Sequence, residues 1–345
     1  MQKIVECVPN FSEGRNLKII NTIGGAISGI PQVKFISAEP DKDYNRTVVT
    51  FIGEPEAVAE AAFEATRTAS ELIDMSTHKG GHPRIGATDV VPFVPVTGVT
   101  MRDCVRLAHL FGKRVGEELG LPVYLYEEAA TRPERKNLSD VRKGEYEGLE
   151  AKLKDPDWVP DYGPVLFNKR CGAVVTGARM FLIAYNVNLK TNDVKVANEI
   201  AMRIRESGRI KKDDKGNPVL DARGKKIVIP GYLKAVKAMG VLLEAHNIAQ
   251  VSINLVNYLV TPPHVAFEAV RKEAASLGIE VTGSEIVGLT PKDALLMAGR
   301  FYAGQKGEAQ AAAQDSEPAH AQPLLERAVE GLGLSDLEPF DLKKK

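Results

Sequence analysis

The sequence has few cysteines and no net charge, so it shows little sign of a zinc site or of nucleic-acid binding. Its 345 residues include three cysteines, Cys7, Cys104 and Cys171, which lie far apart and form no Cys-x-x-Cys pair. This spacing argues against a structural zinc site and favours a reducing compartment. Forty-five basic and 45 acidic residues leave no net charge, so composition does not indicate nucleic acid or anionic lipid as a partner.

Several common signals are also missing. No window approaches the roughly 20 apolar residues that span a bilayer, and the first residues, MQKIVECVPN, lack the pattern of a signal peptide. No GxGxxG, GxxxxGK[ST] or GxSxG motif is present, so a nucleotide-phosphate cradle and a serine nucleophile elbow have no support. We therefore expect a cytoplasmic protein that neither binds nucleic acid nor enters a membrane.

The residues that are present alternate between helical and extended patterns. The hydrophobic fraction of 44% and the charged fraction of 26% are those of a globular protein. The first 126 residues follow the order strand, helix, strand, strand, helix, strand, helix, strand. This order predicts an α+β fold, an α/β sandwich with helices on one face of a mainly antiparallel sheet.

A second αβ region begins near residue 178, so we expect two subdomains, residues 1–177 and 178–345. Residues 129–162 are polar and predict further helix. Residues 209–229 contain two turn clusters and predict a β-hairpin or a mobile excursion. The alanine- and glutamine-rich residues 310–322 predict a linker that precedes a short terminal helix at 324–332.

The most informative stretch runs from Asp74 to Val96, where His78 and His82 lie in a glycine-rich loop before an apolar strand. A neutral imidazole is the natural general base near pH 7, and a loop held by a rigid strand is a common place for one. The competing interpretation is that both histidines only form hydrogen bonds in a surface loop. The residues alone support the two interpretations about equally, and they do not separate His78 from His82. The other four histidines are scattered and predict structural roles and no metal site.

Two further segments carry polar groups suited to a ligand. Asn186 and Asn188 alternate with apolar residues in one predicted strand, and Asn254 has a similar setting in another, so they line either a groove or a partly solvated sheet face. Residues 163–172 begin and end with glycine and could wrap an anionic aromatic ligand through Lys169 and Arg170. Their members are Gly163, Pro164, Val165, Leu166, Phe167, Asn168, Lys169, Arg170, Cys171 and Gly172.

Six motifs in order resemble the formiminotransferase family of folate-linked histidine degradation. They are VECVPNFSEG (5–14), NRTVVTF (45–51), LIDMSTHKGGHPRIGATDVVPFVPV (72–96), GVTM (98–101), LPVYLYEEAA (121–130) and GARMFLIAYNVNL (177–189). The resemblance implies two ferredoxin-like αβ subdomains with a ligand tunnel between them. It also implies an enzyme that transfers a formimidoyl group between N5 of tetrahydrofolate and the amino group of L-glutamate.

The resemblance places the family's catalytic histidine at His82 and its folate-contacting segment at residues 163–172. From the strand pattern described above, we also expect Asn188 and Asn254 to contact folate. An active-site carboxylate, usually Asp in the family, corresponds to Glu39. Tetrahydrofolate is the implied carrier, no metal is implied, and a homodimer is expected. Because nothing after Leu332 is long enough for a cyclodeaminase domain, that second activity is expected to be absent. Two alternatives are a glutamate formyltransferase that uses 5-formyltetrahydrofolate and a non-catalytic folate-binding protein.

Overall fold

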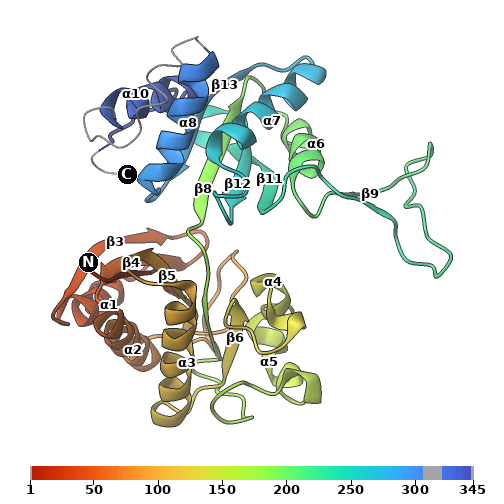
Figure 1. Ribbon diagram of the computed structural model, residues 1–345. Helices are drawn as coiled ribbons and strands as arrows, with labels where there is room; N and C mark the ends of the chain where they lie inside the picture. Colours follow the sequence, from red (N-terminus) through yellow and green to blue (C-terminus); the bar gives the residue numbers. More distant parts are fainter. Residues whose placement is uncertain (1, 306–320, 343–345) are drawn as a thin grey trace. The chain divides into compact units, whose positions relative to one another are not determined.

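The computed structural model describes residues 2–305 and 321–342, and the chain divides into two compact units, Met1–Met180 and Phe181–Lys345 (Figure 1). The predicted boundary between residues 177 and 178 falls at the end of the last strand of unit 1. None of the helices in the described ranges is both long enough and apolar enough to span a bilayer.

Unit 1 is a mixed sheet with helices on both faces. Its elements are β1 (Ile4–Cys7), β2 (Asn10–Phe11), α1 (Leu17–Ser28), β3 (Val33–Asp41), β4 (Arg46–Gly53), α2 (Pro55–Leu72), β5 (Thr88–Thr97), α3 (Met101–Glu118), β6 (Val123–Glu127), η1 (Pro133–Arg135), α4 (Leu138–Val141), α5 (Glu145–Leu153), η2 (Pro156–Trp158) and β7 (Val174–Ala178). The strands β3, β4, β1 and β5 are antiparallel neighbours in that order, which with α1 and α2 is the expected ferredoxin-like βαββαβ arrangement.

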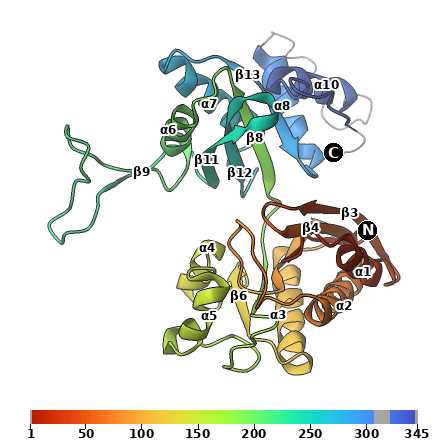
Figure 2. The same cartoon turned by 180° about the vertical axis from the view of Figure 1, so that it is seen from behind.

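The sheet of unit 1 is larger than the sequence predicts. Strand β7 pairs in parallel with β5, and β6 pairs in parallel with β7, so the sheet is mixed and not mainly antiparallel at this edge. Here β6 lies between α3 and the α4–α5 pair (Figures 1 and 2). Val141, Leu149 and Leu153 from α4 and α5 pack with Tyr124 and Val175 of the sheet. Helices therefore cover both faces at this edge, because parallel strands bury both of theirs.

Local signals in the sequence account for the helices beside the candidate site. Helix α1 begins after Asn16, whose side chain accepts hydrogen bonds from the first turn, and it buries Ile20, Ile23 and Ile27. Helix α2 has Pro55 at its first position, where no backbone donor is needed. Helix α3 begins with a capping box between Thr100 and Asp103.

Unit 2 is a second ferredoxin-like sandwich with its own core. Its elements are β8 (Ile183–Leu189), α6 (Val194–Ile204), β9 (Arg209–Ile210), β10 (Val228–Ile229), β11 (Val236–Leu243), η3 (Glu244–His246), β12 (Ile248–Leu255), α7 (Pro263–Ser276), β13 (Val281–Val287), α8 (Lys292–Gln305) and α10 (Ala321–Leu332). The antiparallel order β11-β12-β8-β13 confirms the expected topology.

The predicted excursion forms an arm on unit 2. Strands β9 and β10 pair antiparallel at its base, and the arm extends away from the four-stranded sheet (Figures 1 and 2). Two turns, capped by the side chains of Asp213 and Asp221, hold its outer part. The helix predicted at the C-terminus corresponds to α10, whereas most of the predicted linker falls at residues 306–320, outside the described ranges.

Candidate functional site

The loop that carries His82 lies directly against the segment predicted to contact folate. The backbone N–H of Met75 donates to Arg170 O at 2.8 Å, that of Ala87 donates to Cys171 O at 2.8 Å, and that of Ala173 donates to Ile85 O at 3.0 Å. Hydrogen bonds at both ends of the loop thus join two predicted sites that are about 80 residues apart in sequence. Both sites belong to unit 1.

Two glycines permit this close approach. A Cβ atom on Gly86 would lie 2.1 Å from the carbonyl oxygen of Ala173, and a Cβ on Gly172 would lie 2.1 Å from that of Ile85. Gly172 also has a φ of +69°, which a residue with a side chain adopts only under strain. The spacing between the loop and the segment therefore depends on glycine at both positions.

The turn between β3 and β4 supports the loop from a second side. The side chain of Asn45 donates to Lys79 O at 3.1 Å, and the N–H of Gly81 donates to Asp43 O at 3.3 Å. The ring of Tyr44 meets the His82 ring edge-on, with 5.6 Å between centroids. The NRTVVTF motif therefore contributes to the surroundings of His82 through its first residue and the turn before it.

His82 is half-buried, and its geometry leaves one nitrogen free of protein contacts among the described residues. Its Nδ1 lies 2.7 Å from the backbone oxygen of Pro83, which only a protonated Nδ1 can contact as a donor. The lone pair therefore lies on Nε2. Burial, followed by the nearby Arg46 and Arg142, lowers the pKa of His82 to about 4, so the imidazole is neutral at pH 7.

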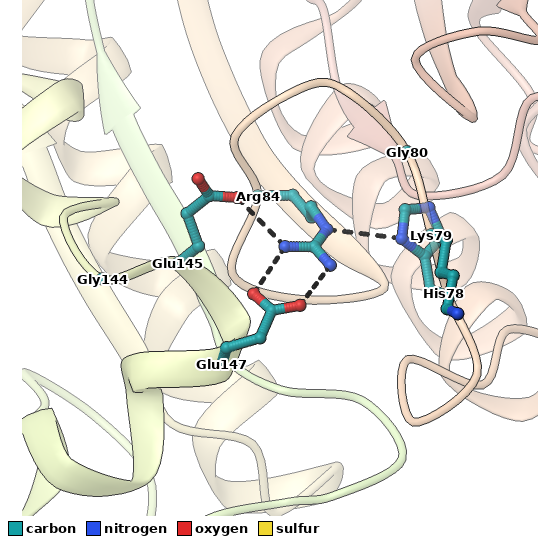
Figure 3. Close-up of a pocket in the computed structure, with 7 residues that line it drawn as sticks. All are labelled: His78, Lys79, Gly80, Arg84, Gly144, Glu145 and Glu147. Atoms are coloured by element: carbon teal, nitrogen blue, oxygen red, sulfur yellow. Dashed lines mark hydrogen bonds and ion pairs between the residues drawn. The ribbon is translucent and has the colours of Figure 1, made fainter.

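His78 differs from His82 because both of its ring nitrogens are used. Its Nε2 lies 2.9 Å from the backbone oxygen of Asn45, and its Nδ1 accepts a hydrogen bond from Arg84 Nε at 3.3 Å. Figure 3 shows the guanidinium of Arg84 between His78 and the two carboxylates of Glu145 and Glu147. A hollow of about 450 Å³ lies among these groups. The structure thus gives the two histidines different hydrogen bonds, whereas the residues alone did not separate them and the family resemblance favoured His82.

A charged cluster beside His82 was not predicted from the sequence. Asp89 is 1% exposed, forms an ion pair with Arg142 and accepts a hydrogen bond from Ile85 N at 3.0 Å. Arg46 donates to the side chain of Asn10, and its buried Nε has no hydrogen-bond partner within the described ranges. Two arginines and one aspartate leave an excess of one positive charge next to a neutral imidazole. A carboxylate at the start of an apolar strand, as in TDVVPF, was the signal that could have identified Asp89.

Glu39 lies on β3 opposite Val48 of β4, and Val48 is also opposite Asn10 of β2. Residues opposite one another share a face of the sheet, so Glu39 lies on the same face as Asn10 and Arg46. Its side chain is exposed and accepts a hydrogen bond from Ser37 Oγ at 3.3 Å. The carboxylate that acts on the pKa of His82 is Asp89, which partly offsets the two arginines.

Glu6 is a second acidic group that the sequence reasoning did not single out. It lies on β1 opposite Ile52 and Val94 and is 3% exposed. Burial raises its pKa to about 7, and the positive charge of Arg179 opposes that shift. A buried carboxyl group that titrates near neutral pH is typical of functional sites.

The segment 163–172 presents a mixed surface. Val165 and Leu166 are 55% and 69% exposed, and Phe167 packs at 5.5 Å from the Tyr146 ring. The Lys169 side chain is exposed. The Arg170 guanidinium instead donates to Ser70 O and Glu71 O at the end of α2, so it stabilises a helix terminus.

The three asparagines considered as a ligand groove belong to unit 2, and two of them are hydrogen-bonded within that unit. Asn188 is fully buried; it donates to Asp336 at 2.9 Å and accepts from Gln250 at 2.7 Å, and Asn186 donates to Glu285 at 2.9 Å. These bonds use the side chains of Asn186 and Asn188 within the unit, and the predicted folate contact of Asn188 stays a prediction. Asn254 is exposed, and its role stays a prediction.

The remaining histidines have structural surroundings where they are described. His109 Nδ1 lies 2.8 Å from the hydroxyl of Tyr162, and His264 stacks on Phe301 with 4.7 Å between centroids. His246 is exposed, and His320 lies outside the described ranges.

Comparisons with known proteins agree with the six motifs. Residues 4–179 match the model of the formiminotransferase domain, N-terminal subdomain, and residues 184–345 match that of the formiminotransferase domain. The glutamate formimidoyltransferases of Streptococcus pyogenes serotype M1 and Thermoplasma acidophilum are 43% and 45% identical, over 88% and 87% of this chain and 94% and 92% of their own lengths.

The mouse formimidoyltransferase-cyclodeaminase is 48% identical over the whole of this chain, which spans 59% of that protein. Both halves of the chain are thus accounted for by one family, as the motifs predicted. The chain belongs to the formiminotransferase family.

Proposed function

We propose that the protein is a glutamate formimidoyltransferase that transfers the formimidoyl group between 5-formimidoyltetrahydrofolate and L-glutamate in histidine degradation. The observation that carries the proposal is the hydrogen-bonded contact between the His82 loop and segment 163–172. It brings the loop that carries a neutral imidazole against the segment that the family resemblance assigns to folate. Two relatives that carry the name glutamate formimidoyltransferase, matched over almost their whole length, support the same substrates.

His82 is the proposed general base, acting through Nε2. As the amino nitrogen of glutamate attacks the formimidoyl carbon, a new C–N bond forms and Nε2 accepts the proton released from that nitrogen. The bond between this carbon and N5 of tetrahydrofolate then breaks. N5 keeps the electron pair and takes the proton back from His82. Such positioned proton transfer contributes about 10²- to 10⁴-fold to a rate.

Arg46 and Arg142 are the proposed partners of a glutamate carboxylate. Their excess positive charge favours an anion, and Arg46 retains an unused buried donor. A bound carboxylate would offset the two cations that lower the pKa of His82. The amino-acid substrate would thereby make the imidazole a stronger base at the moment it is needed.

Segment 163–172 offers separate surfaces for the parts of a folate. The exposed Val165 and Leu166 suit the aromatic rings, and the exposed Lys169 suits a carboxylate. Glu39 is retained as a proposed site carboxylate because it shares the sheet face of Arg46. The expected tunnel, and the contribution of Asn254 to it, stay predictions.

The deciding experiment is an assay for tetrahydrofolate release from 5-formimidoyltetrahydrofolate that depends on added glutamate. Release that requires both the donor and glutamate supports the proposal. A parallel reaction with 5-formyltetrahydrofolate tests formyl transfer, and faster turnover with that donor would replace the proposed substrate. Folate binding without turnover of either donor would make the protein a folate-binding protein and refute the enzyme.

We further propose a cytoplasmic homodimer. Cys7, Cys104 and Cys171 are buried and unpaired, which is consistent with a reducing compartment. Sedimentation of the purified protein tests the dimer, and a monomer at micromolar concentration would refute it.

A further inference from the structure

Arg84 carries a permanent charge in a place that is almost closed to water. The residue is 6% exposed, and a buried guanidinium is tolerated only where partners satisfy it. Glu147 accepts a two-pronged pair of hydrogen bonds, at 2.8 Å from Nη1 and 2.6 Å from Nη2, and Glu145 accepts a third at 3.0 Å from Nη1. Both glutamates belong to the first turn of α5. The bidentate geometry fixes the direction of the guanidinium as well as its position.

The Nε donor of Arg84 reaches back to the other end of the histidine loop. Arg84 Nε donates to Nδ1 of His78 (Figure 3). Nε2 of His78 then donates to the backbone oxygen of Asn45. One side chain thus joins three parts of unit 1, namely α5, the start of the loop and, through His78, the turn between β3 and β4. Only residues 79–83 lie between His78 and Arg84, which are both held by these hydrogen bonds.

The backbone of Arg84 extends the same connection to segment 163–172. Its carbonyl oxygen accepts a hydrogen bond from Tyr146 N at 2.8 Å. The hydroxyl of Tyr146 donates to Lys169 O at 2.5 Å, and the Tyr146 ring packs on Phe167. Arg84 and Tyr146 therefore form a bridge between the histidine loop and the segment proposed to contact folate.

One hydrogen bond links the His82 ring to the residue before Arg84. The Nδ1–H of His82 is held by the backbone oxygen of Pro83, the residue directly before Arg84. A shift of the Pro83–Arg84 peptide would therefore turn Nε2 away from its direction. We propose that Arg84, with Glu147 as its principal partner, is a positioning residue that aligns the His82 imidazole with the folate segment. This assignment rests on the proposed function.

The test compares Arg84→Lys and Glu147→Gln with the wild-type protein. Arg84→Lys keeps the charge but loses the fork, and Glu147→Gln keeps the shape but loses the charge. We expect kcat to fall roughly 10- to 100-fold in each, because a displacement of about 1 Å can have an effect of that size, while the KM values for both substrates change less than about threefold. The double variant should be no worse than the more damaging single variant, since both changes break the same bridge.

Arg67→Lys is the matched control. Arg67 also pairs with two glutamates, Glu64 and Glu71, but lies exposed on the surface of the same unit. The Arg67→Lys variant should leave kcat unchanged. Wild-type kcat in both bridge variants, or a loss of kcat that is matched by the control, would overturn the proposal.

A spectroscopic measurement separates this proposal from the proposed function. In nitrogen-15 spectra the ring of His82 should show a single tautomer with the proton on Nδ1 in the wild-type protein, and a mixture of tautomers in Glu147→Gln. His82→Asn identifies the signal. Identical spectra for wild type and Glu147→Gln would refute the positioning role even if the wild-type protein had no transferase activity. Absence of that activity would refute the proposed function alone.

Discussion

At the scale of single residues, the environment distinguishes side chains that composition treats as equal. His78 and His82 share one loop, yet His78 uses both ring nitrogens in hydrogen bonds whereas His82 keeps the Nε2 lone pair. Arg84 lies in the motif that carries the histidines and Arg170 lies in segment 163–172, and both guanidinium groups are hydrogen-bonded to protein partners. Sequence spacing could not reveal these roles, because His78 depends on Asn45, Arg84 on Glu147 and Arg170 on Glu71, all of them distant in the chain.

His82→Ala removes the proposed base. We expect kcat to fall about 10²- to 10⁴-fold, which is the usual contribution of positioned proton transfer. The dissociation constant for tetrahydrofolate, measured by calorimetry, should stay within a few-fold, because the segment 163–172 is unaltered. Turnover near the wild-type rate would show that another group acts as the base.

Arg46→Gln removes one of the two cations that depress the basicity of His82. The pKa of His82, about 4 in the wild-type protein, should rise because the arginine charge disfavours protonation of the ring. An NMR titration of the free protein measures this shift, and the KM for glutamate should rise in parallel. Arg106→Gln, at an exposed ion pair with Glu56, is the control. An unchanged His82 titration would remove Arg46 from the site.

At the scale of elements, the strongest local signals in the sequence were sufficient to predict where helices form. The isoleucine spacing of α1, the proline of α2 and the threonine cap of α3 all correspond to helices in the structure. The parallel pairing of β5, β7 and β6 was not predicted, because about 50 residues separate β6 from β7 and their pairing has no local signature. The contact between the histidine loop and segment 163–172 was not predicted for the same reason, because the two are distant in the sequence.

Gly172→Ala tests that contact. Gly172 and Gly120 both have positive φ values, +69° and +63°, but only Gly172 would place its Cβ against a backbone atom, Ile85 O. We expect Gly120→Ala to lower the free energy of unfolding by about 1 kcal/mol through backbone strain alone. Gly172→Ala should lower it by about 2–4 kcal/mol, because the loop and the segment must also separate. Urea denaturation measures both, and equal losses would contradict the role of the close approach.

At the scale of the whole molecule, two units with separate cores make up the chain, and each is built on a ferredoxin-like βαββαβ order. The first carries His82, Glu39, the charged cluster and segment 163–172. The second carries Asn188, Asn254 and the arm formed around β9 and β10. The order of strand and helix patterns predicted an αβ sandwich for the first unit, and the family resemblance implied the same fold for both units.

The stability of the protein should depend on pH through His264. Burial lowers the pKa of His264 to about 4 in the folded state, whereas the unfolded chain has a value near 6.5. Between these values the unfolded state binds more protons, so the free energy of unfolding falls as the pH falls through this window. His264→Phe keeps a ring against Phe301 without a titrating group. From pH 7 to pH 5 it should lose roughly 1–2 kcal/mol less than the wild-type protein in urea denaturation. Equal losses would show that His264 is not buried as a neutral group.

The sequence by itself determined the α+β class, the helices with clear caps and stripes, and the family, because these depend on local patterns and on motifs in a fixed order. It also led to the prediction that the histidine loop carries the catalytic base. Only the tertiary structure decided which histidine keeps a free nitrogen, which arginines surround it and which segment lies against it. Those properties depend on residues such as Arg46, Arg142 and Glu147, which come near the loop through folding and not through spacing along the chain.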